Sequence, residues 1–329
     1  MKNPLISSAS SRKKPKLSVC VITYNHEKYI RQCLQSLVDQ QVCFDYDIVV
    51  GDDASTDGTR KIISEFEDRY PGKVRAFLHD ENVGPCQNYR DVHFQARGEY
   101  IAHIDGDDYW MPWKLQQQSD FLDSHHECVA VYGNAVVISD DQSLLGAFND
   151  RIPEVFDLDF LLARGNFLNN SSLCYRTIHR ERVLPDGDFL DYLVHLRLGC
   201  IGKLGYLNKA LVVYRAGSAT SVLLNLSNVC RELSWEALHA AQLMPVSKDA
   251  ERSAMSLFFF DVLHEGVRRF DIPFMLHWTQ RIYADSGGMG SSAMLAGLFR
   301  AVLFLVMAPT RRMRRFFFGS PSFRVFHGR

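Results

Sequence analysis

The sequence lacks the cysteine pairs that would indicate a zinc site or a disulfide framework. It contains no Cys-x-x-Cys pair and no close cysteine cluster. The eight cysteines lie singly along the chain at Cys20, Cys33, Cys43, Cys86, Cys128, Cys174, Cys200 and Cys230. We therefore expect reduced thiols in the core of a cytosolic protein.

Net charge and a long apolar run are also missing. The formal charge is -1 and the pI is 6.9, so the chain as a whole has no strong attraction to nucleic acid. Residues 1–16 are rich in Ser, Lys and Pro and lack the apolar core of a secretory signal, which predicts a flexible basic tail. Residues 292–308 are almost wholly apolar, but a helix of about 17 residues spans about 26 Å, short of the roughly 30 Å hydrocarbon core. Arg300 near its middle further disfavours a membrane span.

Glycine is absent from loop 24–27, which follows the first predicted strand. Dinucleotide-binding and P-loop sites need a glycine-rich backbone there, because only such a loop lets the main chain approach phosphates closely. This absence argues against both kinds of site. It also weakens a sugar-nucleotidyltransferase alternative, which normally has a glycine-rich phosphate loop at that point.

The pattern that is present predicts an α/β fold. The chain has 329 residues, 47% of them hydrophobic, which is enough for one large domain with an appendage. Apolar runs of strand length alternate with segments of helical periodicity and occupy residues 17–23, 46–50, 74–78 and 100–104. Such alternation predicts a doubly wound, mostly parallel sheet flanked by helices, with ligands at the carboxyl ends of the strands.

An unusual concentration of acid follows the fourth run. Asp105, Asp107 and Asp108 surround Gly106 at one chain reversal, where their charges would repel each other in isolation. Carboxylate oxygens suit a hard divalent cation, Mg²⁺ or Mn²⁺. The alternative is a solvated acidic turn, since Asp and Gly are common turn formers.

Other polar loops follow the other strands and should line the same crevice. They contain Thr23 to Glu27, Asp52 with Asp53, and Asn82 with Gly84. Four motifs, in this order, resemble those of the family 2 inverting glycosyltransferases, which have the nucleotide-diphospho-sugar-binding fold called GT-A. The motifs are Val19-Cys-Val-Ile-Thr-Tyr-Asn25, Val49-Val-Gly-Asp-Asp-Ala-Ser-Thr-Asp-Gly-Thr59, Glu81-Asn-Val-Gly84 and Asp105-Gly-Asp-Asp-Tyr-Trp110. The resemblance covers residues 16–221.

The resemblance implies a set of donor-binding residues and a metal site. The residues expected to contact a nucleoside-diphosphate sugar, with a UDP-sugar the expected donor, are Thr23, Tyr24, Asn25, Asp52, Asp53, Asn82, Asp105, Gly106 and Arg215. Asp105 and Asp107 would hold Mg²⁺ or Mn²⁺, and Asp108 would hold the turn together. Asp57 is expected to cap the helix that follows it.

An inverting transfer also needs a base for the acceptor hydroxyl. Family members carry an Asp before an apolar helix, then Gly-Lys-x-Gly-Tyr and a Tyr-Arg pair, which match Asp191, residues 202–206 and residues 214–215. The resemblance therefore selects Asp191 as the base, with Asp188 in reserve. Asp191 could also serve as the helix N-cap, and the helix dipole would then hold its pKa low. Residues 166–176, which lead to the base, are expected on the acceptor side.

One position departs from the family pattern. Many relatives have a His two residues after the Tyr-Arg pair, proposed to help hold the metal or the diphosphate, whereas this chain has Gly217. His103 and His195 are not obvious replacements, because a satisfied core or surface histidine is the commoner outcome in such segments. The departure keeps a catalytically weak nucleotide-sugar-binding or scaffold protein as an alternative.

The expected organisation has four parts. They are the tail 1–16, a catalytic domain 17–221 with a nucleotide-sugar half 17–110 and an acceptor half 111–221, a helical extension 222–290, and a C-terminal segment 291–329. Arg311, Arg312, Arg314 and Arg315 follow the apolar run, which suits an interfacial anchor on an anionic membrane surface. The alternatives are packing on the catalytic domain or in a homodimer.

Together these features predict a metal-dependent, inverting, hexosyltransferase-type enzyme. It would add a sugar to a hydroxyl of a glycan or lipid-linked acceptor in bacterial cell-surface polysaccharide synthesis. We expect it in the cytoplasm, on the inner face of the membrane.

Overall fold

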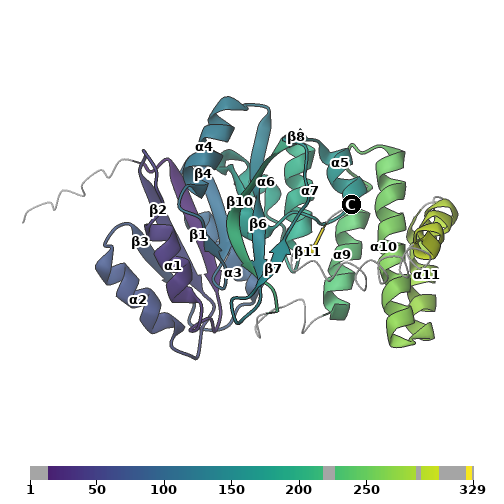
Figure 1. Ribbon diagram of the computed structural model, residues 1–329, viewed down its shortest axis with the longest axis horizontal. Helices are drawn as coiled ribbons and strands as arrows, with labels where there is room; N and C mark the ends of the chain where they lie inside the picture. The colour runs from purple at the N-terminus through teal and green to yellow at the C-terminus, as the bar shows by residue number, and fades with distance from the viewer. Residues whose placement is uncertain (1–13, 218–226, 287–289, 304–323, 328–329) are drawn as a thin grey trace, which may run out of the picture.

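The computed structural model describes residues 14–217, 227–286, 290–303 and 324–327, and its centre is one mixed sheet of eleven strands (Figure 1). The hydrogen-bonded order is β11-β7-β6-β9-β4-β1-β2-β3, and β10 joins through β6, β5 and β8. The strands are β1 (Leu17–Thr23), β2 (Tyr46–Asp52), β3 (Val74–Leu78), β4 (Tyr100–Asp105), β5 (Tyr109–Trp110), β6 (Cys128–Ile138), β7 (Leu144–Ala147), β8 (Val155–Phe156), β9 (Cys174–Arg176), β10 (Lys203–Arg215) and β11 (Arg324–Val325).

Helices cover both faces of the sheet and extend beyond one end of it. They are α1 (Ile30–Val38), α2 (Thr59–Arg69), α3 (Pro85–Gln95), α4 (Lys114–Ser124), α5 (Leu158–Arg164), α6 (Arg180–Val183), α7 (Asp191–Ile201), α9 (Ser227–Ala241), α10 (Lys248–Arg269) and α11 (Ile272–Asp285), with short 3-10 turns η1 (Asn170–Ser172) and η2 (Thr177–His179). Residues 290–303 form a further helix.

The parallel half of the sheet brings three strand ends together. β1 lies between β2 and β4 and pairs in parallel with both. Thr23 is in register with Asp52, and Ile22 is in register with Asp105. The loops that follow these three strands therefore begin side by side, as the rule for parallel sheets predicts.

The strands of this half are mostly apolar because both of their faces are largely buried, and their polar side chains include the buried Ser18, Asp47 and His103. Val19 and Val21 pack in a cluster with residues of α1 and α2, whereas Cys20, between them, belongs to a second cluster with residues of α3. Alternate side chains of one strand thus enter two different cores.

In the other half of the sheet, the acidic turn lies beside the end of β10. β5 follows that turn and pairs antiparallel with β10, with Tyr109 opposite Val213 and Trp110 opposite Val212. Two residues further along the same strand is Arg215, the last residue of β10. This pairing places Arg215 beside the acidic residues that precede β5.

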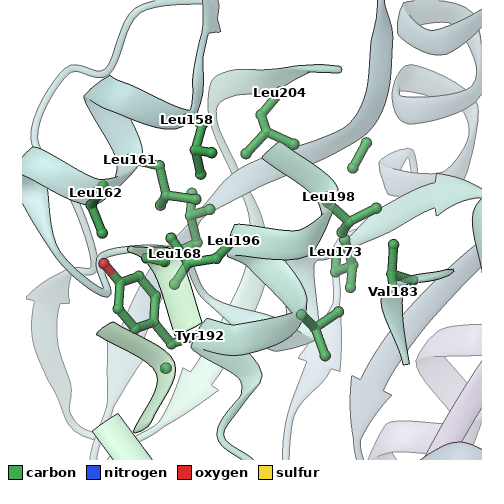
Figure 2. Packing of buried hydrophobic residues seen from close by; sticks show 14 of the residues in the cluster. Leu158, Leu161, Leu162, Leu168, Leu173, Val183, Tyr192, Leu196, Leu198 and Leu204 are labelled. Atoms are coloured by element: carbon green, nitrogen blue, oxygen red, sulfur yellow. The ribbon is translucent and has the colours of Figure 1, made fainter. Parts of the chain in front are cut away.

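A large apolar cluster lies around α7 and joins the sheet to the helical extension. Figure 2 shows Leu196 and Leu198 of α7 packed with Leu158 and Leu161 of α5 and with Leu204 of β10. Beyond them α10 packs against α5 and α9 against α7, at the end of the sheet opposite α2 (Figure 1).

The fold agrees with the predicted α/β, GT-A type architecture with a C-terminal helical region. All eight cysteines are free, but Cys43 and Cys200 are exposed, so the expectation of core thiols is wrong for these two. The two-residue strand β11, which pairs with β7 at the edge of the sheet, was not foreseen. Residues 1–13 of the predicted tail lie outside the described residues.

Candidate functional site

The acidic turn is built against the first loop of the sheet. The Gly106 amide donates to the carbonyl oxygen of Ile22 at 2.9 Å, which holds the turn beside the end of β1. A Cβ atom at position 106 would lie 2.8 Å from Thr23 Oγ1 and 2.9 Å from His26 Nδ1. Glycine is therefore the residue that lets the turn approach the first loop this closely.

Asp105 is held at both of its carboxylate oxygens. Its Oδ1 lies 3.2 Å from His103 Nε2, and the Ser171 hydroxyl lies 3.4 Å from its Oδ2. Burial favours a higher pKa for Asp105, but the hydrogen bonds from His103 and Ser171 together with the charges of His103 and His26 lower the pKa below its usual value. Asp105 is thus an ionised carboxylate whose side chain is 34% exposed.

Asp108 and Arg215 join the acidic turn to the end of β10. The buried Asp108 accepts a hydrogen bond at Oδ1 from the Arg215 backbone amide at 2.8 Å, which confirms its predicted structural role. The Arg215 side chain donates to the carbonyl oxygen of Asp107 at 3.1 Å and lies 4.7 Å from the ring centre of Tyr29. Burial and the charges of Asp107 and Asp105 raise the pKa of Asp108 well above its usual value, which shows how crowded negative charge is here.

The donor set fits one cation that is shared with a substrate. In the part of the chain that the structure describes, no three His, Cys, Asp or Glu side chains are grouped so as to hold a metal ion. Asp105 and Asp107 are both partly exposed on the turn, and Mg²⁺ commonly binds one or two carboxylates and completes its shell with water and substrate phosphates. The assignment of these two residues as metal ligands stays a prediction.

The paired acids after β2 are engaged with the protein itself. Asp52 is buried, and its Oδ2 accepts from Arg60 Nε at 2.6 Å and from the Ser55 amide at 3.0 Å. Asp53 accepts from the amides of Val83 at 2.7 Å and Gly84 at 3.1 Å, so it fastens the loop after β3. Direct contact of either acid with a donor stays a prediction.

Four further donor-binding candidates lie in the same group of loops. Asn25 has a left-handed φ of 53° and accepts at Oδ1 from the Thr56 amide at 2.8 Å, which ties the first loop to the second. Asn82 donates to the carbonyl oxygen of Asp53 at 3.2 Å. Thr23 is buried, whereas the side chain of Tyr24 is 42% exposed beside it. The structure thus brings these predicted residues together, and their contact with a nucleotide stays a prediction.

Asp57 serves the turn before α2 and is not the N-cap of that helix, which is Gly58, so the expected capping role is wrong. Its Oδ1 accepts from the Thr59 amide at the start of α2, and its Oδ2 accepts from the Glu27 amide, both at 3.0 Å. The residue therefore joins the first loop to α2.

Asp191 begins α7, and two expectations about it are wrong. The N-cap of α7 is Leu190, and no side-chain hydrogen bond caps the helix. The pKa of Asp191 is not held low, because burial, with the charge of Asp105 also contributing, raises it to about 6. Asn166 Nδ2 donates to Asp191 Oδ1 at 3.1 Å, which places part of the predicted acceptor segment beside the candidate base.

The histidines differ from the expectation drawn from the sequence. His103 is a buried, hydrogen-bonded residue as expected, but its partner is Asp105, which the sequence pattern gave no means to foresee. His195 is also buried, yet within the described residues neither of its ring nitrogens has a hydrogen-bond partner, so the expectation of a satisfied histidine is wrong there. Burial lowers the pKa of His195 to about 3, which keeps it uncharged.

Gly217 has a φ of 80°, and a Cβ there would meet no atom within 4 Å.

Comparisons with known proteins agree with the fold. The sequence model of the family described as glycosyl transferase family 2 matches residues 18–173. An uncharacterized protein of Mycobacterium tuberculosis is 36% identical over 206 residues, which are 60% of this chain and 58% of that protein. Poly(ribitol-phosphate) beta-N-acetylglucosaminyltransferase TarS of Staphylococcus aureus is 37% identical over 184 residues, which are 53% of this chain and only 29% of that protein. The crystal structure of S. aureus TarS 1-349 in complex with UDP-GlcNAc has the same fold, with a TM-score of 0.64 at 18% identity over 87% of this chain and 89% of that one.

Proposed function

We propose that the chain, which belongs to glycosyl transferase family 2 through residues 18–173, moves a sugar from a nucleoside-diphosphate donor to a hydroxyl group. The proposed acceptor is a glycan or lipid-linked molecule in bacterial cell-surface polysaccharide synthesis. One observation carries the proposal. The ends of β1, β2 and β4 lie side by side within the segment that matches the family model, which groups Thr23, Asp52 and Asp105 in one site. A relative that is named as a transferase of N-acetylglucosamine to poly(ribitol-phosphate) supports the substrate class.

In this proposal the acidic turn faces the departing group. Asp105 and Asp107 would hold Mg²⁺ or Mn²⁺, which supplies charge neutralisation for the diphosphate when it is bound. A UDP-sugar is the proposed donor, because a solved structure of the same fold contains UDP-GlcNAc. The loops joined by Asn25 and Asp53 would surround the nucleotide.

Asp191 performs the acid-base step of the proposed reaction. Its carboxylate takes the proton of the acceptor hydroxyl as the hydroxyl oxygen bonds to the anomeric carbon. The bond from that carbon to the diphosphate oxygen breaks on the opposite face, the nucleoside diphosphate leaves, and the configuration inverts. A pKa of about 6 suits this role, since the group is ionised at neutral pH and remains a stronger base than an ordinary aspartate.

A second candidate function is a nucleotide-sugar-binding or scaffold protein with little activity. Gly217 favours it, because this position has no side chain to offer a metal or a diphosphate. A panel of nucleoside-diphosphate sugars, assayed for release of the nucleoside diphosphate with Mn²⁺ and with a chelator, separates the two. Metal-dependent release from one donor supports the enzyme, whereas tight donor binding without release supports the scaffold. Formation of pyrophosphate from a nucleoside triphosphate and a sugar phosphate would instead indicate a nucleotidyltransferase.

The C-terminal helix carries a proposed membrane-facing surface. Among residues 14–217, 227–286, 290–303 and 324–327, no helix is long and apolar enough to cross a bilayer. The helix 290–303 rests on α10, where Arg300 Nε donates to the Ser256 hydroxyl at 3.0 Å. Large apolar residues with helical spacing remain exposed on it, namely Leu295, Leu298, Phe299, Val302 and Leu303.

An exposed apolar stripe that is followed in the sequence by a cluster of arginines fits an anionic lipid surface. The cluster at residues 311–315 lies outside the described residues. Residues 324–327 lie against the sheet, since β11 pairs with β7, so the proposed membrane-facing part of segment 291–329 does not include them.

The membrane surface can be tested with vesicles. The wild-type chain should sediment with phosphatidylglycerol vesicles and not with phosphatidylcholine vesicles, and Phe299→Glu should weaken this binding. Leu243→Glu is the matched control, because Leu243 is an exposed leucine on another segment. A stable dimer that Phe299→Glu converts to a monomer, without lipid binding by the wild type, would assign the stripe to a homodimer instead.

A further inference from the structure

A row of buried polar side chains runs from the core to the acidic turn. The Tyr175 hydroxyl lies 2.9 Å from His93 Nδ1, His93 Nε2 lies 3.0 Å from His103 Nδ1, and His103 Nε2 lies 3.2 Å from Asp105 Oδ1. Tyr175, His93 and His103 are each 0% exposed. They come from β9, α3 and β4, so three separate elements meet to form the row.

The direction of every hydrogen bond in this row follows from its end. An ionised carboxylate can only accept, so His103 carries its proton on Nε2 and donates to Asp105. If His103 carries only this proton, its Nδ1 accepts, which requires His93 to donate from Nε2. His93 in turn accepts at Nδ1 from the Tyr175 hydroxyl. All three bonds are then satisfied with both histidines in the same tautomer.

Neighbouring rings keep the two histidines in this arrangement. The Tyr89 ring stacks on His93 at a centroid distance of 4.0 Å and lies 4.4 Å from the ring of His103. Burial lowers the pKa of His93 well below its usual value, so this ring stays neutral. A ring flip of either histidine would leave buried nitrogens without the partners that they now have, which is costly.

We propose that Tyr175, His93 and His103 are positioning residues that hold Asp105 in one orientation. Oδ1 is then bound by His103, and Oδ2, which has the longer contact with the Ser171 hydroxyl, is available to the cation and the donor. The consequence for activity rests on the proposed function, whereas the tautomers and the orientation do not. Hydrogen bonds behind a metal-binding group commonly set its geometry, and their loss typically costs 10- to 100-fold in metal affinity or activity. A row of three buried polar groups that ends at a partly exposed carboxylate is the arrangement expected for that task.

The tautomers provide the first test, and this test needs no variant. Nitrogen-15 NMR of the histidine side chains in the wild-type chain, without nucleotide or metal, should show His93 and His103 with the proton on Nε2. In Tyr175→Phe, His93 should lose its hydrogen-bond signature at Nδ1. A proton on Nδ1 of His103 in the wild type would overturn the proposal outright.

A matched pair of variants provides the second test. In His103→Gln the amide nitrogen takes the place of Nε2 and keeps the donor to Asp105, whereas the shorter amide of His103→Asn reaches only toward His93. Binding of Mn²⁺ in the presence of UDP, followed by electron paramagnetic resonance, should weaken about 10-fold or more in His103→Asn and much less in His103→Gln. Equal loss in both, with thermal unfolding of both near that of the wild type, would reduce the row to core packing and overturn the proposal.

The two tests separate failure of the positioning proposal from failure of the proposed function. If the wild type shows the expected tautomers but binds neither UDP nor Mn²⁺ and releases no nucleoside diphosphate, the proposed function is wrong. If the wild type binds Mn²⁺ and UDP and turns over, but His103→Asn binds them as well as the wild type, the positioning proposal is wrong.

Discussion

The hydrogen bond from Asn166 to Asp191 provides a graded test of the candidate base. Asn166 Nδ2 donates to Asp191 Oδ1, and this bond lowers the pKa of Asp191 against the larger effect of burial. In Asn166→Ala the donor is lost, so the carboxylate is less well stabilised and its pKa rises. Hydrogen bonds to charged groups contribute about 1.5–3 kcal/mol, but Asn166 is exposed and water replaces part of the loss, so a shift of roughly one pKa unit is reasonable.

The consequence is a shift of the acidic limb of the pH–rate profile. A base must be unprotonated, so kcat/KM rises with pH through the pKa of the free enzyme, which is about 6 in the wild type and roughly 7 in the variant. At pH 6 the ionised fraction falls from about one half to about one tenth, a loss of roughly fivefold, whereas at pH 8 the rates nearly coincide.

The assay is release of the nucleoside diphosphate from the best donor, measured from pH 5 to pH 9. Asp188→Asn is the control, because Asp188 is exposed and makes no such contact, and its limb should stay in place. A limb that moves to lower pH in Asn166→Ala, or one that moves equally in Asp188→Asn, would refute the argument.

Two further predictions concern the loops of the site. Arg60→Leu should destabilise the fold by about 1–3 kcal/mol in urea unfolding, since it removes the ionic partner of the buried Asp52. The control Lys61→Leu, at an exposed position, should change stability little. Equal stability of the two variants would show that the ion pair is not needed. Gly106→Ala should lower the free energy of unfolding by about 1–3 kcal/mol and weaken UDP binding, because its Cβ would press on Thr23 Oγ1 and His26 Nδ1. A variant that melts and binds UDP like the wild type would contradict this close approach.

The parallel strands could be predicted well because of how they are buried. β1 and β3 have the bounds expected from their apolar runs, since helices on both faces of the sheet make most positions of such a strand apolar. The grouping of the polar loops also followed, because parallel strands place their carboxyl ends at one edge. The motifs then indicated which loop residues belong to the site.

The partners of individual side chains could not be predicted. His93, His103 and Tyr175 come from three elements, and each alone looks like an ordinary core residue. The pKa of Asp191 depends on burial, which a helix-start pattern does not reveal, and for that reason the dipole argument pointed the wrong way. Likewise, nothing in the local pattern showed that Arg60 would fold back onto Asp52.

The measurement that tests the central claim most directly compares Asp191→Asn with the wild type in two assays. The account predicts that release of the nucleoside diphosphate from the sugar donor falls at least about 100-fold, since general-base catalysis contributes about 10²–10⁴-fold. Binding of UDP with Mn²⁺ should stay within about twofold, because Asp191 is not assigned to the donor or the metal. Unchanged release in Asp191→Asn, with binding intact, would contradict the account.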